Sequence, residues 1–73
     1  MTNMTLGETI KERRIALGMT QHNLGQAAGY GDSARATISR IESGSRLPSL
    51  SSLLSIARAL DTRPSTLLKE AGL

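Results

Sequence analysis

The stretch Thr37-Ile38-Ser39-Arg40-Ile41-Glu42-Ser43-Gly44, followed by Pro48, decides the fold of this 73-residue chain. Ile38 and Ile41 have the spacing that places two apolar side chains on the same side of an α-helix. Gly44 directly follows the last helical residue, a position where glycine adopts the left-handed conformation at little cost. The stretch therefore predicts the end of an amphipathic helix and the turn that leaves it.

This helix is expected to begin at Ser33 or Ala34, with Ala34, Ile38 and Ile41 as its buried stripe. Upstream, Thr20 is a suitable N-cap for a shorter helix that Gly29 ends. Leu24, Ala27 and Ala28 are expected to face inward from the shorter helix. Tyr30-Gly31-Asp32-Ser33 lies between the two helices and is typical of a turn.

Three further helices are predicted from caps and apolar spacing. The first follows a capping box at Thr5 and Glu8 and ends near Leu17 and Gly18. Leu6, Ile10, Arg14 and Leu17 are expected on one side of this first helix. The fourth follows Ser49 and covers about 50–60, with inward residues Leu50, Leu53, Leu54, Ala57 and Leu60. The fifth starts with Pro64 and runs to about Glu70, with Leu67 and Leu68 inward.

Composition supports a single all-α domain. The chain has no Cys, Phe or Trp, so Ile, Leu and Ala must form the core without disulfides or a cysteine-based zinc site. No strand pattern, secretory signal or apolar run of about 18 residues is present, so a cytoplasmic protein without a membrane partner is expected. No paired carboxylates in a plausible cleft or glycine-rich nucleotide motif occur, so we expect no enzyme activity, cofactor, metal or small-molecule ligand.

The charge balance favours a polyanionic partner. The formal net charge is +3, from nine Lys and Arg against six Asp and Glu. Arginine dominates the cations, and its guanidinium group matches both phosphate oxygens and the O6/N7 edge of guanine. Ordinary surface arginines are the alternative that composition leaves open. The arginines are Arg13, Arg14, Arg35, Arg40, Arg46, Arg58 and Arg63.

Taken together, an ordered set of residues over about 6–70 resembles the λ-repressor/Cro-like (XRE-type) helix-turn-helix family. The resemblance implies a compact five-helix DNA-binding domain over 6–70, with 1–5 as a tail and 71–73 as the C-terminal end. The helix-turn-helix would consist of the second and third helices. The set comprises Thr20-Gln21, Leu24, Ala28-Gly29, Ile38-Ser39, Ile41-Glu42, Gly44 and Pro48.

The chain departs from the compact family pattern at two places. Gly29 precedes Ile38 by nine positions, whereas the family pattern has six, so three extra residues lie within 30–36. Either the turn is longer or the third helix starts nearly one turn early, which affects the expected position of Arg35 and Ala36. Gly25 stands where the family commonly has Ala, at a position that packs against the third helix.

A polar face opposite the buried stripe of the third helix is the predicted base-contacting surface, which we call the reading face. Long donors and small side chains alternate there, as entry into the major groove requires. Plain solvent exposure is the alternative interpretation of these residues. The reading face comprises Arg35, Ala36, Ser39, Arg40 and Ser43.

The resemblance also implies phosphate contacts and one structural ion pair. Gln21 would contact a phosphate and support the third helix, and Arg46 would lie along the DNA backbone. The alternatives are a cap-region Gln21 and a solvated Arg46. Arg14 and Glu42 would form a buried pair joining the first and third helices. The expected phosphate contacts are Thr20, Gln21, His22, Arg46 and Arg13.

The expected function is a sequence-specific transcriptional regulator, a repressor, that reads double-stranded DNA with residues 33–43 of the third helix. A homodimer on a palindromic operator is the expected assembly. The alternative is an antitoxin or interaction module that binds a partner protein as well as DNA. The expected dimer contacts, unless they simply close the core of one monomer, are Ile56, Leu67, Leu68 and Leu73.

Overall fold

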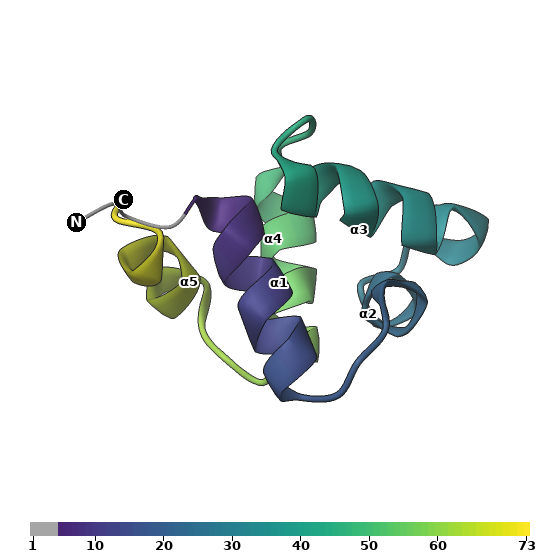
Figure 1. The fold of residues 1–73 in the computed structure, drawn as a ribbon, viewed down its shortest axis with the longest axis horizontal. Coiled ribbons are helices and arrows are strands. Elements are labelled where there is room, and N and C mark those ends of the chain that lie inside the picture. The colour runs from purple at the N-terminus through teal and green to yellow at the C-terminus, as the bar shows by residue number, and fades with distance from the viewer. Residues whose placement is uncertain (1–4) are drawn as a thin grey trace.

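A computed structural model describes residues 5–73 and contains five α-helices and one short 3₁₀-helix in that part of the chain (Figure 1). The predicted all-α architecture is confirmed. No helix within residues 5–73 combines the length and the apolar character needed to cross a bilayer. The elements are α1 (Leu6–Ala16), α2 (Gln21–Ala27), η1 (Gly31–Ser33), α3 (Ala34–Ser43), α4 (Leu50–Ala59) and α5 (Pro64–Glu70).

Local side-chain caps start three of the helices where the sequence predicts them. The Thr5 hydroxyl accepts from the Glu8 amide at 3.1 Å, and the Glu8 carboxylate accepts from the Thr5 amide at 3.1 Å. Thr20 and Ser49 accept from the backbone amides of Asn23 and Ser52 in the same way. These bonds satisfy amides that a helix start leaves without a partner.

The core lies where all five helices meet. In Figure 1, α3 crosses the upper part of the molecule and α4 lies behind α1. α5 packs to the left of α1, on the side away from α2. The largest helix-to-helix contact joins α2 and α3, the two halves of the predicted helix-turn-helix. The core residues are Ile10, Leu24, Ile38, Ile41, Leu53, Ile56, Ala57, Leu60 and Leu67.

The predicted inward stripe of α4 is confirmed at Leu53, Ala57 and Leu60 and is wrong at Leu50 and Leu54. Leu50 is 74% exposed and Leu54 is 47% exposed, whereas Ile56 is fully buried. The buried stripe is Leu53, Ile56, Ala57 and Leu60, which has the same helical spacing as the predicted one. Two apolar stripes overlap in this helix, and packing against the other helices selects the one that contains Ile56.

Smaller differences lie near the helix ends. Leu17 is exposed because it follows the last turn of α1, and Ala27 is exposed at the end of α2. Thr5 and Ala71 belong to the folded unit rather than to the ends outside 6–70, since Thr5 caps α1 and Ala71 is buried. The rest of the expected N-terminal tail, residues 1–4, lies outside the described residues.

Two glycines allow helices to approach α3 closely. A Cβ atom on Gly25 would lie 2.5 Å from the Cβ of Ala34, so the expected packing of this position against the third helix is confirmed. A Cβ on Gly7 would collide with the backbone carbonyls of Ile41 and Glu42. Glycine at these positions therefore lets α1 and α2 fix the position of α3 through direct backbone contact.

Candidate nucleic-acid interface

The two sides of α3 differ sharply in exposure. Ala34, Ile38 and Ile41 are buried, together with Thr37 and Glu42. The opposite side lies at the outer edge of the molecule in Figure 1, away from the core. All five residues of the predicted reading face are exposed: Arg35, Ala36, Ser39, Arg40 and Ser43.

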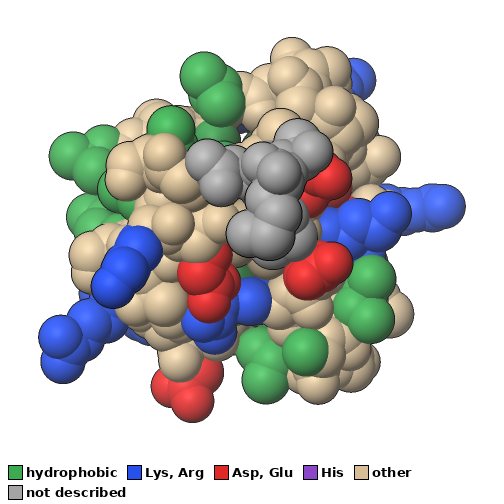
Figure 2. All heavy atoms as spheres, turned by 60° about the vertical axis from the view of Figure 1, so that its left-hand side comes forward, with side chains coloured by type: hydrophobic (Ala, Val, Ile, Leu, Met, Phe, Trp, Pro, Cys, Tyr) green, Lys and Arg blue, Asp and Glu red, His purple; other side chains and the backbone are tan. Residues whose placement is uncertain are grey.

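Exposed charge on α3 and the loop after it is entirely positive. Arg35, Arg40 and Arg46 are exposed, whereas Glu42 is buried. Figure 2 shows a different face of the molecule, on which acidic and basic side chains are interspersed. The three exposed arginines give α3 and the loop after it a positive charge, which suits a partner with regularly spaced negative charges.

The turn after α3 is organised around one carbonyl. The backbone amides of Ser45 and Arg46 donate to the Arg40 carbonyl at 3.0 and 3.2 Å. The Ser43 hydroxyl donates to the same carbonyl at 3.0 Å and lies 3.1 Å from the Ser45 hydroxyl. Gly44 takes φ 85°, as the sequence predicts for a left-handed helix end. The Ser43 hydroxyl thus stabilises the turn, although Ser43 itself remains exposed.

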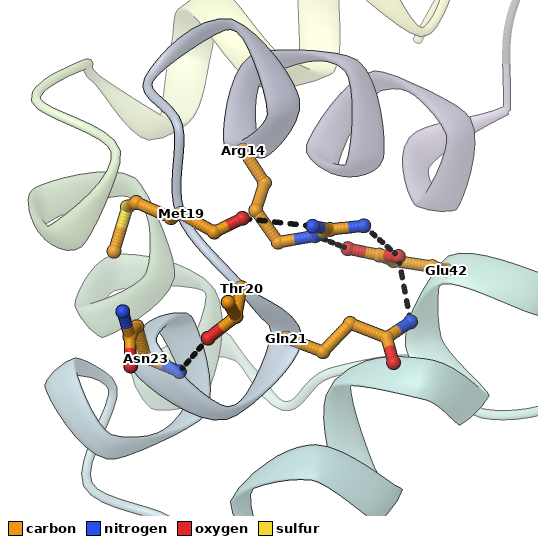
Figure 3. Close-up of polar contacts among 6 residues, drawn as sticks. All are labelled: Arg14, Met19, Thr20, Gln21, Asn23 and Glu42. Carbon is orange, nitrogen blue, oxygen red and sulfur yellow. Dashed lines mark hydrogen bonds and ion pairs between the residues drawn. The ribbon is translucent and has the colours of Figure 1, made fainter.

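A buried ion pair joins α1 to α3, as the resemblance implies (Figure 3). Arg14 Nε donates to Glu42 Oε2 at 2.6 Å, and Nη2 donates to Oε1 at 3.1 Å. Nη1 of the same guanidinium donates to the Met19 carbonyl at 2.9 Å, just before α2. The guanidinium group therefore holds both α3 and the chain entering α2.

Gln21 has a structural partner that the sequence pattern alone did not identify. Its Nε2 donates to Glu42 Oε1 at 3.0 Å, as Figure 3 shows. Gln21 is half-buried, whereas Thr20 and His22 are exposed beside it. The expected support of the third helix by Gln21 is therefore present, and its amide nitrogen is directed into the protein.

Arg13 has a partner other than the predicted phosphate. Its Nε and Nη2 donate to the two carboxylate oxygens of Glu70 at 3.0 and 2.8 Å, which joins α1 to α5. The hydrogen bond from Arg13 lowers the pKa of the Glu70 carboxyl and raises the pKa of the guanidinium. The Glu70 carboxylate thus engages two donors of Arg13 on the α1–α5 seam, while its phosphate contact stays a prediction.

Tyr30 contacts Arg46 and was missed by the sequence analysis. The guanidinium carbon of Arg46 lies 5.8 Å from the centroid of the Tyr30 ring, within the range of a cation–π interaction. Tyr30 is the only residue of the chain among Phe, Trp and Tyr, and this rarity is the sequence signal that could have identified it. Its hydroxyl is buried without a hydrogen-bond partner among the described residues.

The connection between α2 and α3, where the sequence predicts three extra residues, contains one short 3₁₀-helix. The turn, η1, spans Gly31–Ser33 and leads directly into α3 at Ala34. Gln26 Nε2 donates to the Gly31 carbonyl at 3.0 Å, which ties the added turn to α2. Arg35 and Ala36 consequently lie in the first turn of α3 and are exposed.

The predicted dimer contacts are only partly accessible. Ile56 and Leu67 are fully buried, because α4 and α5 close the core with these side chains. Their assignment to a dimer interface is therefore wrong. Leu68 is half-buried and Leu73 is 81% exposed, so these two retain accessible apolar surface.

Similarities to known proteins agree with this geometry. The helix-turn-helix family model matches residues 10–67. The P22 c2 repressor in complex with a synthetic operator is 33% identical, with a TM-score of 0.82 over 92% of this chain and 97% of that chain. The solution structure of the P22 c2 DNA-binding domain is also 33% identical, with a TM-score of 0.84 over 94% and 87%.

A third similar structure is the restriction-modification controller protein C.AhdI from Aeromonas hydrophila. It is 34% identical to this chain, with a TM-score of 0.77 over 85% of this chain and 89% of that chain. No curated protein sequence matches the chain. The structural similarities therefore extend over nearly the whole of both molecules in each pair.

Proposed function

Because the chain belongs to the XRE/Cro/C1-type helix-turn-helix family, a family of non-enzymatic DNA-binding domains, we propose that it binds double-stranded DNA and regulates transcription. Its similarity to a repressor bound to an operator and to a restriction-modification controller supports this role. Repression is the form of regulation we favour, since one of the similar structures is a repressor bound to an operator.

The observation that carries the proposal is the exposed polar face of α3, fixed in place by contacts on its other side. An α-helix with side chains is about as wide as the major groove of B-DNA. Arg40 would donate to the O6/N7 edge of a guanine, and Ser39 and Ala36 would permit close approach. Arg35 would extend the contact from the first turn of α3, and Ser43 from the last.

Phosphate contacts would flank the groove and set the register of the domain on the duplex. Arg46 follows the last turn of α3 and is exposed. Thr20 and His22 are exposed at the start of α2, which Gln21 ties to α3 through Glu42. Since these contacts come from both ends of the helix-turn-helix, they would orient α3 along the groove.

Two copies on a palindromic operator would supply the affinity that one small domain lacks. In such an arrangement the two α3 helices lie in successive major grooves, roughly 34 Å apart. Each half-site would then receive the same contacts, because a two-fold axis relates the two domains.

Selection of bound duplexes from a random-sequence library tests the proposal directly. The expected outcome is enrichment of one sequence with two related halves, followed by a mobility shift of that duplex at much lower protein concentration than a scrambled duplex. If no sequence is enriched and both duplexes bind equally, sequence-specific DNA binding is refuted.

A further inference from the structure

Tyr30 and Arg46 come from the two connections that flank α3, and they contact each other in the fold. Tyr30 directly precedes η1, and Arg46 lies in the loop between α3 and α4. The guanidinium carbon of Arg46 lies over the Tyr30 ring, 5.8 Å from its centroid. The contact therefore joins the connection that enters α3 to the loop that leaves it.

The Tyr30 ring is held in place from several sides. The backbone amide of Tyr30 donates to the Gly25 carbonyl at 3.0 Å, and its carbonyl accepts from the Ser33 amide at 3.1 Å. The side chain packs against the core, and its hydroxyl is buried. Because an aromatic side chain has only two χ angles, a ring held in this way is a rigid surface for Arg46.

The backbone of Arg46 is fixed as well, whereas its side chain has few other restraints. Its amide donates to the Arg40 carbonyl at 3.2 Å. The two ion pairs within residues 5–73 belong to Arg13 and Arg14, so Arg46 has no carboxylate partner in that part of the chain. A free arginine side chain samples many rotamers, and ordering them on binding costs affinity. The Tyr30 ring restricts these rotamers before DNA arrives.

A contact of this type leaves Arg46 able to bind an anion. An aromatic face attracts a cation through its quadrupole and does not use up the N–H donors as a carboxylate does. Arg13, by contrast, donates Nε and Nη2 to Glu70. Arg46 is exposed, so its guanidinium can rest on the ring and still donate to a phosphate oxygen.

We propose that Tyr30 is a positioning residue, which holds the Arg46 guanidinium in the free protein where a phosphate of bound DNA receives it. The inference rests on the proposed function, and Tyr30 acts on DNA through Arg46 alone. The contact persists in the complex, so Arg46 loses little freedom on binding. If Arg46 instead had to leave the ring to reach the phosphate, loss of the ring would strengthen binding.

A double-mutant cycle on DNA affinity tests the proposal. Tyr30→Leu should weaken binding to the selected duplex by about threefold to tenfold, because Arg46 is no longer ordered in advance. In the Arg46→Ala background, the same substitution should change the affinity by less than about 1.5-fold. Tyr30→Phe keeps the ring and should bind as wild type does. Stronger binding by Tyr30→Leu, or equal losses in both backgrounds, would overturn the proposal.

Arg40→Ala provides the matched control cycle, because Arg40 is also an exposed arginine of the proposed DNA-binding surface. Its effect and that of Tyr30→Leu should be additive within about twofold. Equal coupling of Tyr30 to Arg40 and to Arg46 would show that the ring acts on α3 as a whole, which would refute the specific role.

Salt dependence separates positioning from loss of the phosphate contact. Tyr30→Leu should keep the wild-type slope of log K against log salt, since Arg46 still reaches the phosphate once DNA is bound. Arg46→Ala should lower this slope. A slope that Tyr30→Leu lowers as much as Arg46→Ala does would contradict the proposal, because the ring would then be needed for the contact itself.

Solution NMR of the wild-type protein provides a measurement without any substitution. The ring current of Tyr30 should shift the side-chain resonances of Arg46 upfield in the free protein, and the shift should remain when the selected duplex is added. Arg35 is the internal reference. No shift in the free protein, or its loss on DNA, would overturn the inference.

Failure of the proposed function gives a different result from failure of this inference. If wild type binds no duplex specifically, the proposed function is refuted and the inference with it. Specific binding by wild type without coupling between Tyr30 and Arg46 refutes the inference alone.

Discussion

Gln21 and Arg14 donate to the same carboxylate oxygen of Glu42, at 3.0 and 3.1 Å, from two different helices. The carboxylate on α3 is therefore held by α1 and α2 together. Side-chain hydrogen bonds to a buried charge are stronger than those between neutral groups. This arrangement fixes the angle between the two helices of the helix-turn-helix.

Glu42→Gln should destabilise the fold by about 3–5 kcal/mol, because the Arg14 guanidinium would remain buried without its counter-charge. The free energy of unfolding from urea titration, followed by far-ultraviolet circular dichroism, measures this loss. Glu12→Gln is the control, since Glu12 is exposed, and its effect should stay within about 0.5 kcal/mol. A similar small effect for both variants would show that the pair does not stabilise the fold.

The Arg13–Glu70 pair should make stability depend on pH in the acid range. Because the hydrogen bond from Arg13 lowers the pKa of folded Glu70, the pair stabilises the protein above the unfolded-state pKa of a glutamate. That contribution is lost as the pH falls through the lowered pKa of the folded state. The unfolding free energy of wild type should therefore exceed that of Glu70→Gln at neutral pH, with the difference vanishing in acid.

Urea titrations of wild type and Glu70→Gln at a series of pH values provide this comparison. The Glu8 carboxyl, whose pKa is lowered by the backbone hydrogen bond from Thr5, adds pH dependence of the same sign to both proteins. It cancels in the difference between them. A difference that persists unchanged into acid would contradict the role assigned to the pair.

Arg40→Ala should weaken binding to the selected duplex by about 1–3 kcal/mol and relax the preference at one base pair. The reason is that Arg40 is a long donor on the exposed side of α3. Mobility-shift titrations with each single-base variant of the duplex measure both effects. Lys69→Ala on α5 removes a cation away from α3 and serves as the control. Equal affinities of Arg40→Ala and wild type would exclude Arg40 from base contact.

Arg46→Ala should weaken binding to specific and to non-specific DNA by similar factors, because a phosphate contact carries no sequence information. The slope of log K against log salt should become shallower by about one unit. Fluorescence anisotropy of the selected and a scrambled duplex, at several salt concentrations, gives both quantities. An unaltered slope would remove Arg46 from the phosphate contacts.

Tyr30→Phe should stabilise the fold by about 1 kcal/mol, because it removes a buried hydroxyl that has no partner among the described residues. The aromatic ring and its cation–π contact with Arg46 are retained in this variant. Tyr30→Leu is the companion variant and should be less stable than Tyr30→Phe, since it lacks the ring. The midpoints of thermal unfolding compare the three proteins, and a lower midpoint for Tyr30→Phe would contradict the assignment.

The starts and ends of the helices were predictable because they depend on neighbouring residues. Thr5 with Glu8, Thr20 and Ser49 form caps within three residues of their partners, and Gly44 ends α3 in a left-handed conformation. These are short-range effects that any chain with the same local sequence would show. The exposure of the reading face was predictable too, because its residues lie on the side of α3 opposite a clear apolar stripe.

Contacts between distant residues could not be predicted in the same way. Arg13 and Glu70 are 57 positions apart, and nothing near either residue identifies the other as its partner. The phase of α4 also depended on the rest of the fold, because Ile56 and Leu54 offer competing apolar faces. The dimer residues were misassigned for this reason, since a buried Ile56 is available only to its own core.

The glycine that opens η1 limits how the connection between α2 and α3 can be changed. Gly31 takes φ 59°, a left-handed conformation that a side chain adopts only under strain. No atom lies within 4 Å of a Cβ placed on Gly31, so space around it is not the obstacle. A substitution at Gly31 is therefore expected to be resisted by the backbone conformation alone, even though the position is exposed.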